Sequence, residues 1–258
     1  MTYSRLEGSA GAPVVVLSNS LGTTHAMWDP QVPALREHFA VLRYDHPGHG
    51  EGRGEAPVSS VEGLALGVLA ILDEREISRV SFCGLSLGGA VGMWLAMNAP
   101  ERIDRLVLAC TSARFGTREN WLQRAATVRS CGMEAIADAV LALWFTPRTH
   151  RTDSALVSDY RAMMVSAERE GYAGCCEALA DWDPGDSLKA IRAPTLVLAG
   201  SEDPATPPEQ GEAIRQRITG ARMSILAGAG HLANLEQPAA FTQLLLDHLT
   251  TSPAVEVA

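Results

Sequence analysis

Short runs of apolar, β-branched residues alternate with stretches of helical periodicity along most of the chain. The runs are apolar on both sides, which is typical of strands buried between two layers of helices. We expect strands at residues 14–18, 41–44, 79–84, 105–110, 195–200 and 223–226, and helices near 30–39, 61–74, 87–99, 209–218 and 239–249. This alternation predicts an α/β fold with a mostly parallel sheet covered by helices on both faces.

One stretch interrupts the alternation. Residues 114–182 contain no convincing strand, and their apolar residues recur at helical spacing. We therefore expect a core in two parts, residues 1–113 and 183–258, with a helical insertion between them. Ligands bind at the carboxyl ends of the strands in open α/β sheets. A helical cap over that edge is favoured over helices that merely pack on the sheet.

Composition narrows the class of protein. The length of 258 residues suits one large domain, or one domain with a sizeable insertion. The content of 47% hydrophobic and 20% charged residues is typical of a globular chain. The net charge of −9 gives an acidic surface that repels phosphate backbones, so no nucleic-acid partner is expected. An acidic surface does not exclude a small anionic ligand, provided that a local Arg or Lys binds it.

The cysteines and the apolar runs bear on location. Five Cys is an odd number with no spacing typical of a disulfide framework or a CxxC metal site. The chain begins without the apolar core of a signal peptide, and the run at 65–72 is far too short for a membrane span. We expect a soluble cytoplasmic protein without a membrane partner.

The strongest chemical pattern is GLSLG at residues 84–88, between an expected strand and an expected helix. A sharp strand-to-helix turn forces Ser86 into a strained conformation with its hydroxyl exposed above the sheet. Gly84 and Gly88 keep the crossing backbone segments free of side-chain clashes. A Gly/Ser helix start without catalysis is the alternative, but this context favours Ser86 as a nucleophile.

A serine nucleophile needs a base, and the base needs an acid. His231 follows the last expected strand after a Gly-rich loop, and Asp203 follows the strand at 195–200, so both are expected at the carboxyl edge of the sheet. The order Ser, Asp, His is that of α/β-hydrolases. Glu202 is the nearest rival to Asp203 but should point elsewhere. His25 lies near the first loop and could touch a ligand. The other histidines are expected on helices (His38 and His248), in a tight turn (His46 and His49) or at the surface (His150).

Two further sequence features complete the expected reaction centre. The loop after the first expected strand can direct the Leu21 amide at the same oxygen as the Leu87 amide, forming an oxyanion hole. His46 and His49 share a tight turn and suggest a metal site, but no third ligand follows at a matching spacing. We expect a structural turn there and no metal.

The chain resembles the α/β-hydrolase superfamily over its whole length, and more narrowly the 3-oxoadipate enol-lactonases of bacterial aromatic degradation. The segments that carry the resemblance are residues 18–31, 44–54, 84–96, 171–183, 196–208 and 228–238. The most selective are SNSLGTT (18–24), where relatives usually have His-Gly, and GYAGCCEALADWD (171–183). The turn HPGHGEGRG (46–54) departs from the family because it lacks the Ser or Thr common after its second Gly.

The resemblance implies a serine hydrolase that opens a five-membered enol-lactone bearing an acetate arm, through an acyl-serine intermediate and without a cofactor. The substrate carboxylate needs a cation or several donors in the cap. Trp121, Arg124 and Trp144 are the candidates, although Arg on a helix usually faces solvent and Trp usually fills a core. The alternatives are another capped hydrolase (an esterase, a C–C hydrolase or a perhydrolase) or a non-catalytic ligand receptor.

Overall fold

The structure, a computed structural model, describes residues 3–251. Within these residues, seven strands form one sheet in the order β1-β3-β2-β4-β5-β6-β7. The edge strand β1 is antiparallel to β3, and the other strand pairs are parallel. The strand bounds are β1 Ser4–Glu7, β2 Val14–Ser18, β3 Ala40–Tyr44, β4 Val80–Leu85, β5 Ile103–Ala109, β6 Thr195–Gly200 and β7 Arg222–Leu226. The expected mostly parallel α/β sheet is confirmed.

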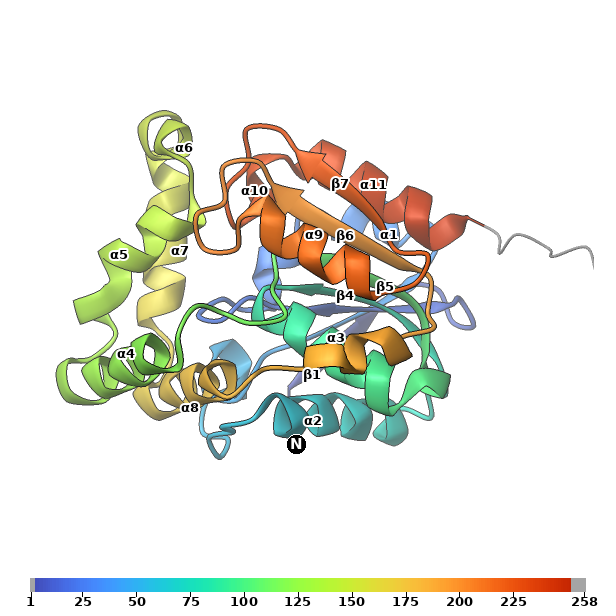
Figure 1. The fold of residues 1–258 in the computed structure, drawn as a ribbon, viewed down its shortest axis with the longest axis horizontal. Helices are drawn as coiled ribbons and strands as arrows, with labels where there is room; N and C mark the ends of the chain where they lie inside the picture. The colour runs from blue at the N-terminus through green and yellow to red at the C-terminus, as the bar shows by residue number, and fades with distance from the viewer. Residues whose placement is uncertain (1–2, 252–258) are drawn as a thin grey trace, which may run out of the picture.

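Helices cover both faces of the sheet (Figure 1). The first face carries α1 and α11, which contact each other, and the second carries α2, α3 and α9. The central strands β2, β4 and β5 are buried on both sides, which explains their continuous apolar runs. The helix bounds are α1 Val32–Leu35, α2 Val61–Glu74, α3 Leu87–Asn98, α9 Pro208–Arg217, α10 Ala233–Glu236 and α11 Pro238–Thr250.

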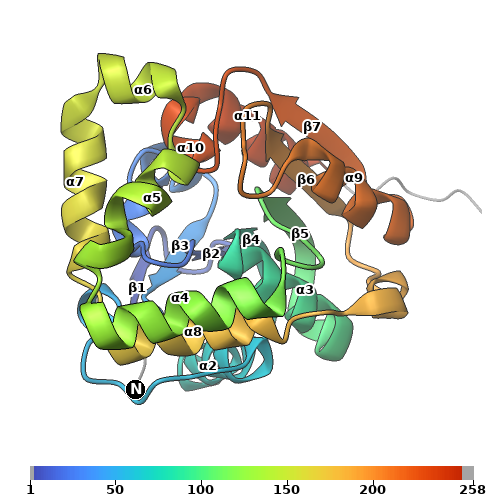
Figure 2. The ribbon, with the colours of Figure 1, turned by 60° about the vertical axis from the view of Figure 1, so that its left-hand side comes forward.

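The segment between β5 and β6 is helical, as its periodicity predicts. It forms α4 Arg118–Cys131, α5 Glu134–Trp144, α6 Pro147–Thr152, α7 Ser154–Val165 and α8 Arg169–Ala180. These helices stand together beside the sheet, with α4 and α8 packed along each other (Figure 2). We call α4–α8 the cap. Its boundaries at 113/114 and 182/183 as a separate unit stay a prediction.

Two local expectations differ from the structure. A helix expected over residues 30–39 is confined to Val32–Leu35, and the chain continues in turns in which the Glu37 and His38 amides bond carbonyls three residues earlier. The strand β1 was not expected from the sequence, because a four-residue edge strand leaves almost no pattern. Across residues 3–251, each helix is too short or too polar to cross a membrane.

Candidate active site

Ser86 lies at the turn from β4 to α3, in a backbone conformation that side chains rarely adopt (φ 58°, ψ −114°). Two glycines make this turn sterically feasible. A Cβ on Gly84 would lie 2.0 Å from the Gly88 carbonyl oxygen, and a Cβ on Gly88 would lie 2.3 Å from the Ser18 carbonyl oxygen. The G-x-S-x-G spacing is therefore required by the close crossing of strand and helix.

Hydrogen bonds fix the backbone of this strained residue. The Ser86 amide donates to the Ala109 carbonyl over 2.9 Å, and the Thr111 hydroxyl donates to the Ser86 carbonyl over 2.7 Å. Both partners belong to β5 or to the residues directly after it. The neighbouring strand thus holds the Ser86 side chain at the mouth of a cavity, which Ser86 lines.

Asp203 and His231 are paired in the interior. His231 Nδ1 lies 2.9 Å from Asp203 Oδ2, and both side chains are almost fully buried. The other acceptor positions of the carboxylate are used as well: Oδ1 accepts from the amides of Ala205 and Thr206, and Oδ2 from the Thr206 hydroxyl. The rival Glu202 is exposed to solvent.

This environment keeps Asp203 ionised. Burial alone would raise the pKa of the Asp203 carboxyl, but His231 and the hydrogen bonds from Thr206 outweigh burial and lower it. Because a carboxylate can only accept, His231 Nδ1 is the donor in the pair, which leaves Nε2 of the neutral ring as an acceptor. His231 lines the same cavity as Ser86. The geometry can therefore support a serine nucleophile with an imidazole base.

Two backbone amides lie free beside Ser86. Among residues 3–251, neither the Leu21 amide nor the Leu87 amide donates a hydrogen bond to another group. The two segments are joined directly, since the Gly88 amide donates to the Asn19 carbonyl over 3.1 Å. Leu21 also lines the cavity. Free amides on two joined segments are what an oxyanion hole requires.

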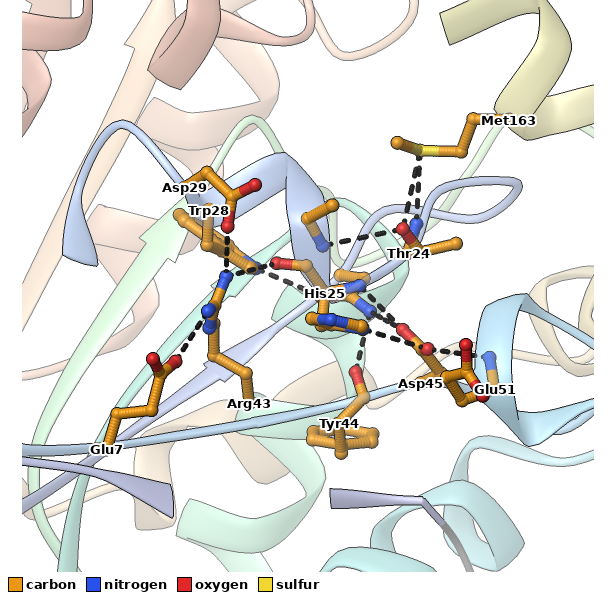
Figure 3. Close-up of polar contacts among 12 residues, drawn as sticks. Glu7, Thr24, His25, Trp28, Asp29, Arg43, Tyr44, Asp45, Glu51 and Met163 are labelled. Atoms are coloured by element: carbon orange, nitrogen blue, oxygen red, sulfur yellow. Dashed lines mark hydrogen bonds and ion pairs between the residues drawn. The ribbon is translucent and has the colours of Figure 1, made fainter. Parts of the chain in front are cut away.

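The loop that carries Leu21 is anchored by Asp45, whose side chain points at His25 (Figure 3) and which was not among the residues expected from the sequence. The buried Asp45 carboxylate accepts from the His25 amide over 2.5 Å, from His25 Nδ1 over 3.0 Å and from the Glu51 amide over 3.0 Å. Burial would raise the pKa of this carboxyl, but the hydrogen bonds from His25 and Glu51 lower it. His25 is thus a structural residue of the loop.

The cap also contacts the loop that carries Leu21. Met163 of α7 accepts through its sulfur from the amide and the hydroxyl of Thr24, at 3.4 and 3.6 Å (Figure 3). Gly22 has φ +84°, and a Cβ there would lie 3.1 Å from the Tyr172 ring and 3.3 Å from the Trp144 ring. Only glycine fits this contact between loop and cap without strain.

The cavity has a volume of about 230 Å³ and lies between the strand ends and the cap. It includes all three cap residues proposed from sequence, Trp121, Arg124 and Trp144. The Arg124 guanidinium lies over the Trp121 ring, 4.6 Å from its centre. Residues that sequence reasoning missed also line it, namely Ser20, Phe115, Asn120 and Tyr172. Helical periodicity does not say which face of a cap helix meets the cavity, so nothing local distinguished Asn120 of α4 and Tyr172 of α8, while Ser20 and Phe115 lie in loops.

The two histidines of the HPGHG turn have structural environments. His46 and His49 are buried in the turn after β3, where burial lowers the pKa of both and brings that of His46 to about 4. His46 Nε2 bonds the Asn19 carbonyl and His49 Nδ1 the Pro47 carbonyl, each as donor. Among residues 3–251, no group of three or more His, Cys, Asp or Glu side chains is arranged to hold a metal ion.

The model of the alpha/beta hydrolase family matches residues 14–244. The chain belongs to this family. An alpha/beta hydrolase of this kind is an enzyme, and its sheet with a helical insertion after β5 agrees with the fold that the resemblance implied.

Several relatives cover nearly the whole chain. A 3-oxoadipate enol-lactonase 2 from Acinetobacter baylyi is 37% identical over 91% of this chain and 87% of its own. The crystal structure of the enol-lactonase from Burkholderia xenovorans is 42% identical, covers 96% of each chain and has a TM-score of 0.94. A sequence from Pseudomonas savastanoi pv. phaseolicola, provisionally named carbamate hydrolase RutD, is 29% identical over 93% of this chain and 95% of its own.

Proposed function

We propose that this alpha/beta hydrolase opens the ring of 3-oxoadipate enol-lactone to give 3-oxoadipate, with Ser86, His231 and Asp203 as its catalytic triad. The substrate proposal depends on one observation, the position of Arg124 in the cavity wall. Arg124 faces the cavity together with Ser86 and stacks on Trp121. Among residues 3–251, no ion pair includes Arg124, so its charge is available for a substrate carboxylate.

The reaction follows from the positions of the donors and acceptors. Ser86 Oγ attacks the lactone carbonyl while His231 Nε2 takes its proton, and the Leu21 and Leu87 amides stabilise the oxyanion. The ring C–O bond then breaks, and the enol oxygen leaves with the proton that His231 took from Ser86. The released enol becomes a ketone when this proton moves from the oxygen to the neighbouring alkene carbon. A water molecule that gives a proton to His231 hydrolyses the acyl-Ser86 ester. The chain supplies each of these groups, and the proposal includes no cofactor.

The cavity fits a small substrate with one negative charge. A volume of about 230 Å³ holds a five-membered ring with a short arm rather than a long acyl chain. Trp121 and Trp144 offer flat apolar walls for the ring, and Arg124 offers a charge-assisted hydrogen bond for the arm. The relatives named enol-lactonases support the same substrate.

The wider setting is part of the proposal. This reaction belongs to the β-ketoadipate pathway of aromatic-compound degradation. The cysteines Cys83, Cys110, Cys131, Cys175 and Cys176 are all free, which fits a reducing cytoplasm.

A substrate panel tests the proposal. We expect purified enzyme to hydrolyse the enol-lactone with a kcat/KM at least 100-fold above that for p-nitrophenyl acetate, roughly the worth of one charge-assisted contact in the cavity. Carbamate and neutral lactones of similar size serve as comparison substrates, given the relative named carbamate hydrolase. Equal kcat/KM for the enol-lactone and the neutral ester would remove the substrate proposal but not the triad.

A further inference from the structure

His231 lies on a loop whose two neighbouring amides are both bound to groups outside the loop. The Gly230 amide donates to Glu236 Oε2 over 2.6 Å, and the Leu232 amide donates to the Trp144 carbonyl over 3.1 Å. Glu236 is the last residue of the short helix α10, and Trp144 is the last residue of α5 in the cap. The backbone on each side of the imidazole is therefore fixed by a separate contact.

The second carboxylate oxygen of Glu236 reaches the cap. Oε1 accepts from the Thr146 amide over 2.9 Å, from the Thr146 hydroxyl over 2.7 Å and from the Thr149 hydroxyl over 2.5 Å. Thr146 directly precedes α6, and Thr149 lies in its first turn. One carboxylate thus binds four donors, one from the His231 loop and three from the cap. Among residues 3–251, no Lys or Arg forms an ion pair with Glu236.

We propose that Glu236 is a positioning residue that fixes the general base relative to the cap. This proposal rests on the proposed function, because it assigns Glu236 a role in placing His231 for that reaction. A charged carboxylate suits this task because it accepts at both oxygens, whereas an amide of equal size must turn an N–H group toward one set of donors. Gly230 completes the contact, because a Cβ there would lie 3.0 Å from Glu236 Oε2 and 3.1 Å from the Trp144 carbonyl oxygen.

The same contact connects the His231 loop to Trp144, which forms part of the cavity wall. Trp144 lines the cavity through its side chain and binds the His231 loop through its carbonyl. Glu236 holds the residues directly after Trp144. Loss of the carboxylate should therefore disturb two things together: the direction of His231 Nε2 toward Ser86, and the position of Trp144 against the substrate.

The test compares Glu236→Gln with Glu209→Gln, a control at an exposed glutamate in the first turn of α9. We expect Glu236→Gln to lower kcat for the enol-lactone 10- to 100-fold and to slow labelling of Ser86 by a fluorophosphonate by a similar factor. The acid limb of the pH profile for labelling should also shift, because that limb reports the base. Glu209→Gln should stay within twofold of wild type in each measurement.

A second variant keeps the proposal testable if Glu236→Gln folds poorly. Thr149→Val removes one donor to Oε1 and nearly preserves shape, so we expect a two- to fivefold lower labelling rate and, on a Glu236→Gln background, no further loss. Unchanged labelling rate and pH profile in folded Glu236→Gln, or in Thr149→Val where the first is unfolded, would overturn the proposal. Labelling needs no lactone, so a wild-type enzyme that labels well but leaves the lactone intact contradicts only the proposed substrate.

Discussion

The exposed side of the cap and its cavity side use the same residue type in opposite ways. Helix α4 carries Arg118, Arg124 and Arg129. Arg118 pairs with Asp181 beyond the end of α8, and Arg129 pairs with two glutamates of α8, all at exposed or half-exposed positions. Arg124 has no such partner among residues 3–251 and faces the cavity instead.

Helix geometry explains this division. At about 100° per residue, Arg118 and Arg129 are separated by three turns and lie on nearly the same face, whereas Arg124 lies about 120–140° away from both. The outward pairs join α4 to α8 and its end, whereas the inward arginine lines the cavity and has no acidic partner among residues 3–251. The comparison teaches that angular position around the helix, rather than residue type, separates a structural arginine from a candidate binding residue.

The largest expected effect concerns the core side of the cavity. Ser86→Ala should lower turnover about 10⁴- to 10⁶-fold, because the nucleophile and its base act as one unit. Fluorophosphonate labelling of the folded variant should disappear, while its thermal midpoint stays near or above that of wild type. If the variant kept turnover within tenfold of wild type, Ser86 would not be the nucleophile. The groups that matter most for catalysis would then have to come from the cap.

A smaller effect tests the division within α4. Arg124→Met should lower kcat/KM for the enol-lactone about 10- to 100-fold, mainly through KM, because it removes a charge-assisted contact worth about 1.5–3 kcal/mol. Activity on p-nitrophenyl acetate should hardly change. Arg129→Met is the matched control on the outer face and should alter neither substrate by more than about twofold. Equal losses in the two variants would contradict a distinct role for Arg124.

The smallest effect concerns stability. It compares a buried, uncharged histidine of the core with the exposed ion pairs of the cap. Burial and the nearby His49 lower the pKa of His46 to about 4 in the folded core, while an unfolded chain binds that proton near pH 6.5. The neutral ring therefore stabilises the fold fully above pH 6.5, and this contribution is lost as pH falls toward 4. Urea unfolding should give a free energy about 1–2 kcal/mol lower at pH 5 than at pH 7 from this group.

His46→Gln supplies the control for that measurement. The variant should be less stable at pH 7 because the contact to the Asn19 carbonyl changes, but its unfolding free energy should depend less on pH between 7 and 5. The ion pairs of the cap lie at exposed or half-exposed positions, where water screens them, so they contribute little to the unfolding free energy. An identical pH dependence in wild type and variant would assign the acid sensitivity to another group, such as the buried His248.

Much of the fold was predictable because local patterns encode it. The helix Val61–Glu74 and the strand Thr195–Gly200 have the predicted bounds, since each has one clear periodicity between distinct ends. The edge strand Ser4–Glu7 had no such pattern. Asp203 and His231 were candidates because of chain order and their place after strands, and the structure brings His231 Nδ1 within 2.9 Å of Asp203 Oδ2.

Other parts of the site depend on contacts between distant segments. Asp45 and Glu236 each bind several donors, and the donors come from different elements. No local periodicity marks a residue for such a role. Arg124 was a candidate because it is a cation on an expected cap helix that also carries Trp121. Its orientation toward the cavity was not predictable, because tertiary packing decides how a cap helix is turned and sequence periodicity does not specify it.

The positive φ of Ser86 has an evolutionary consequence. A glycine at this position would adopt the same backbone conformation without steric conflict, so selection for thermal robustness alone would favour replacement of the nucleophile. Directed evolution of this enzyme toward heat resistance therefore needs a screen for turnover in every round, since its most strained residue is also the one its chemistry requires.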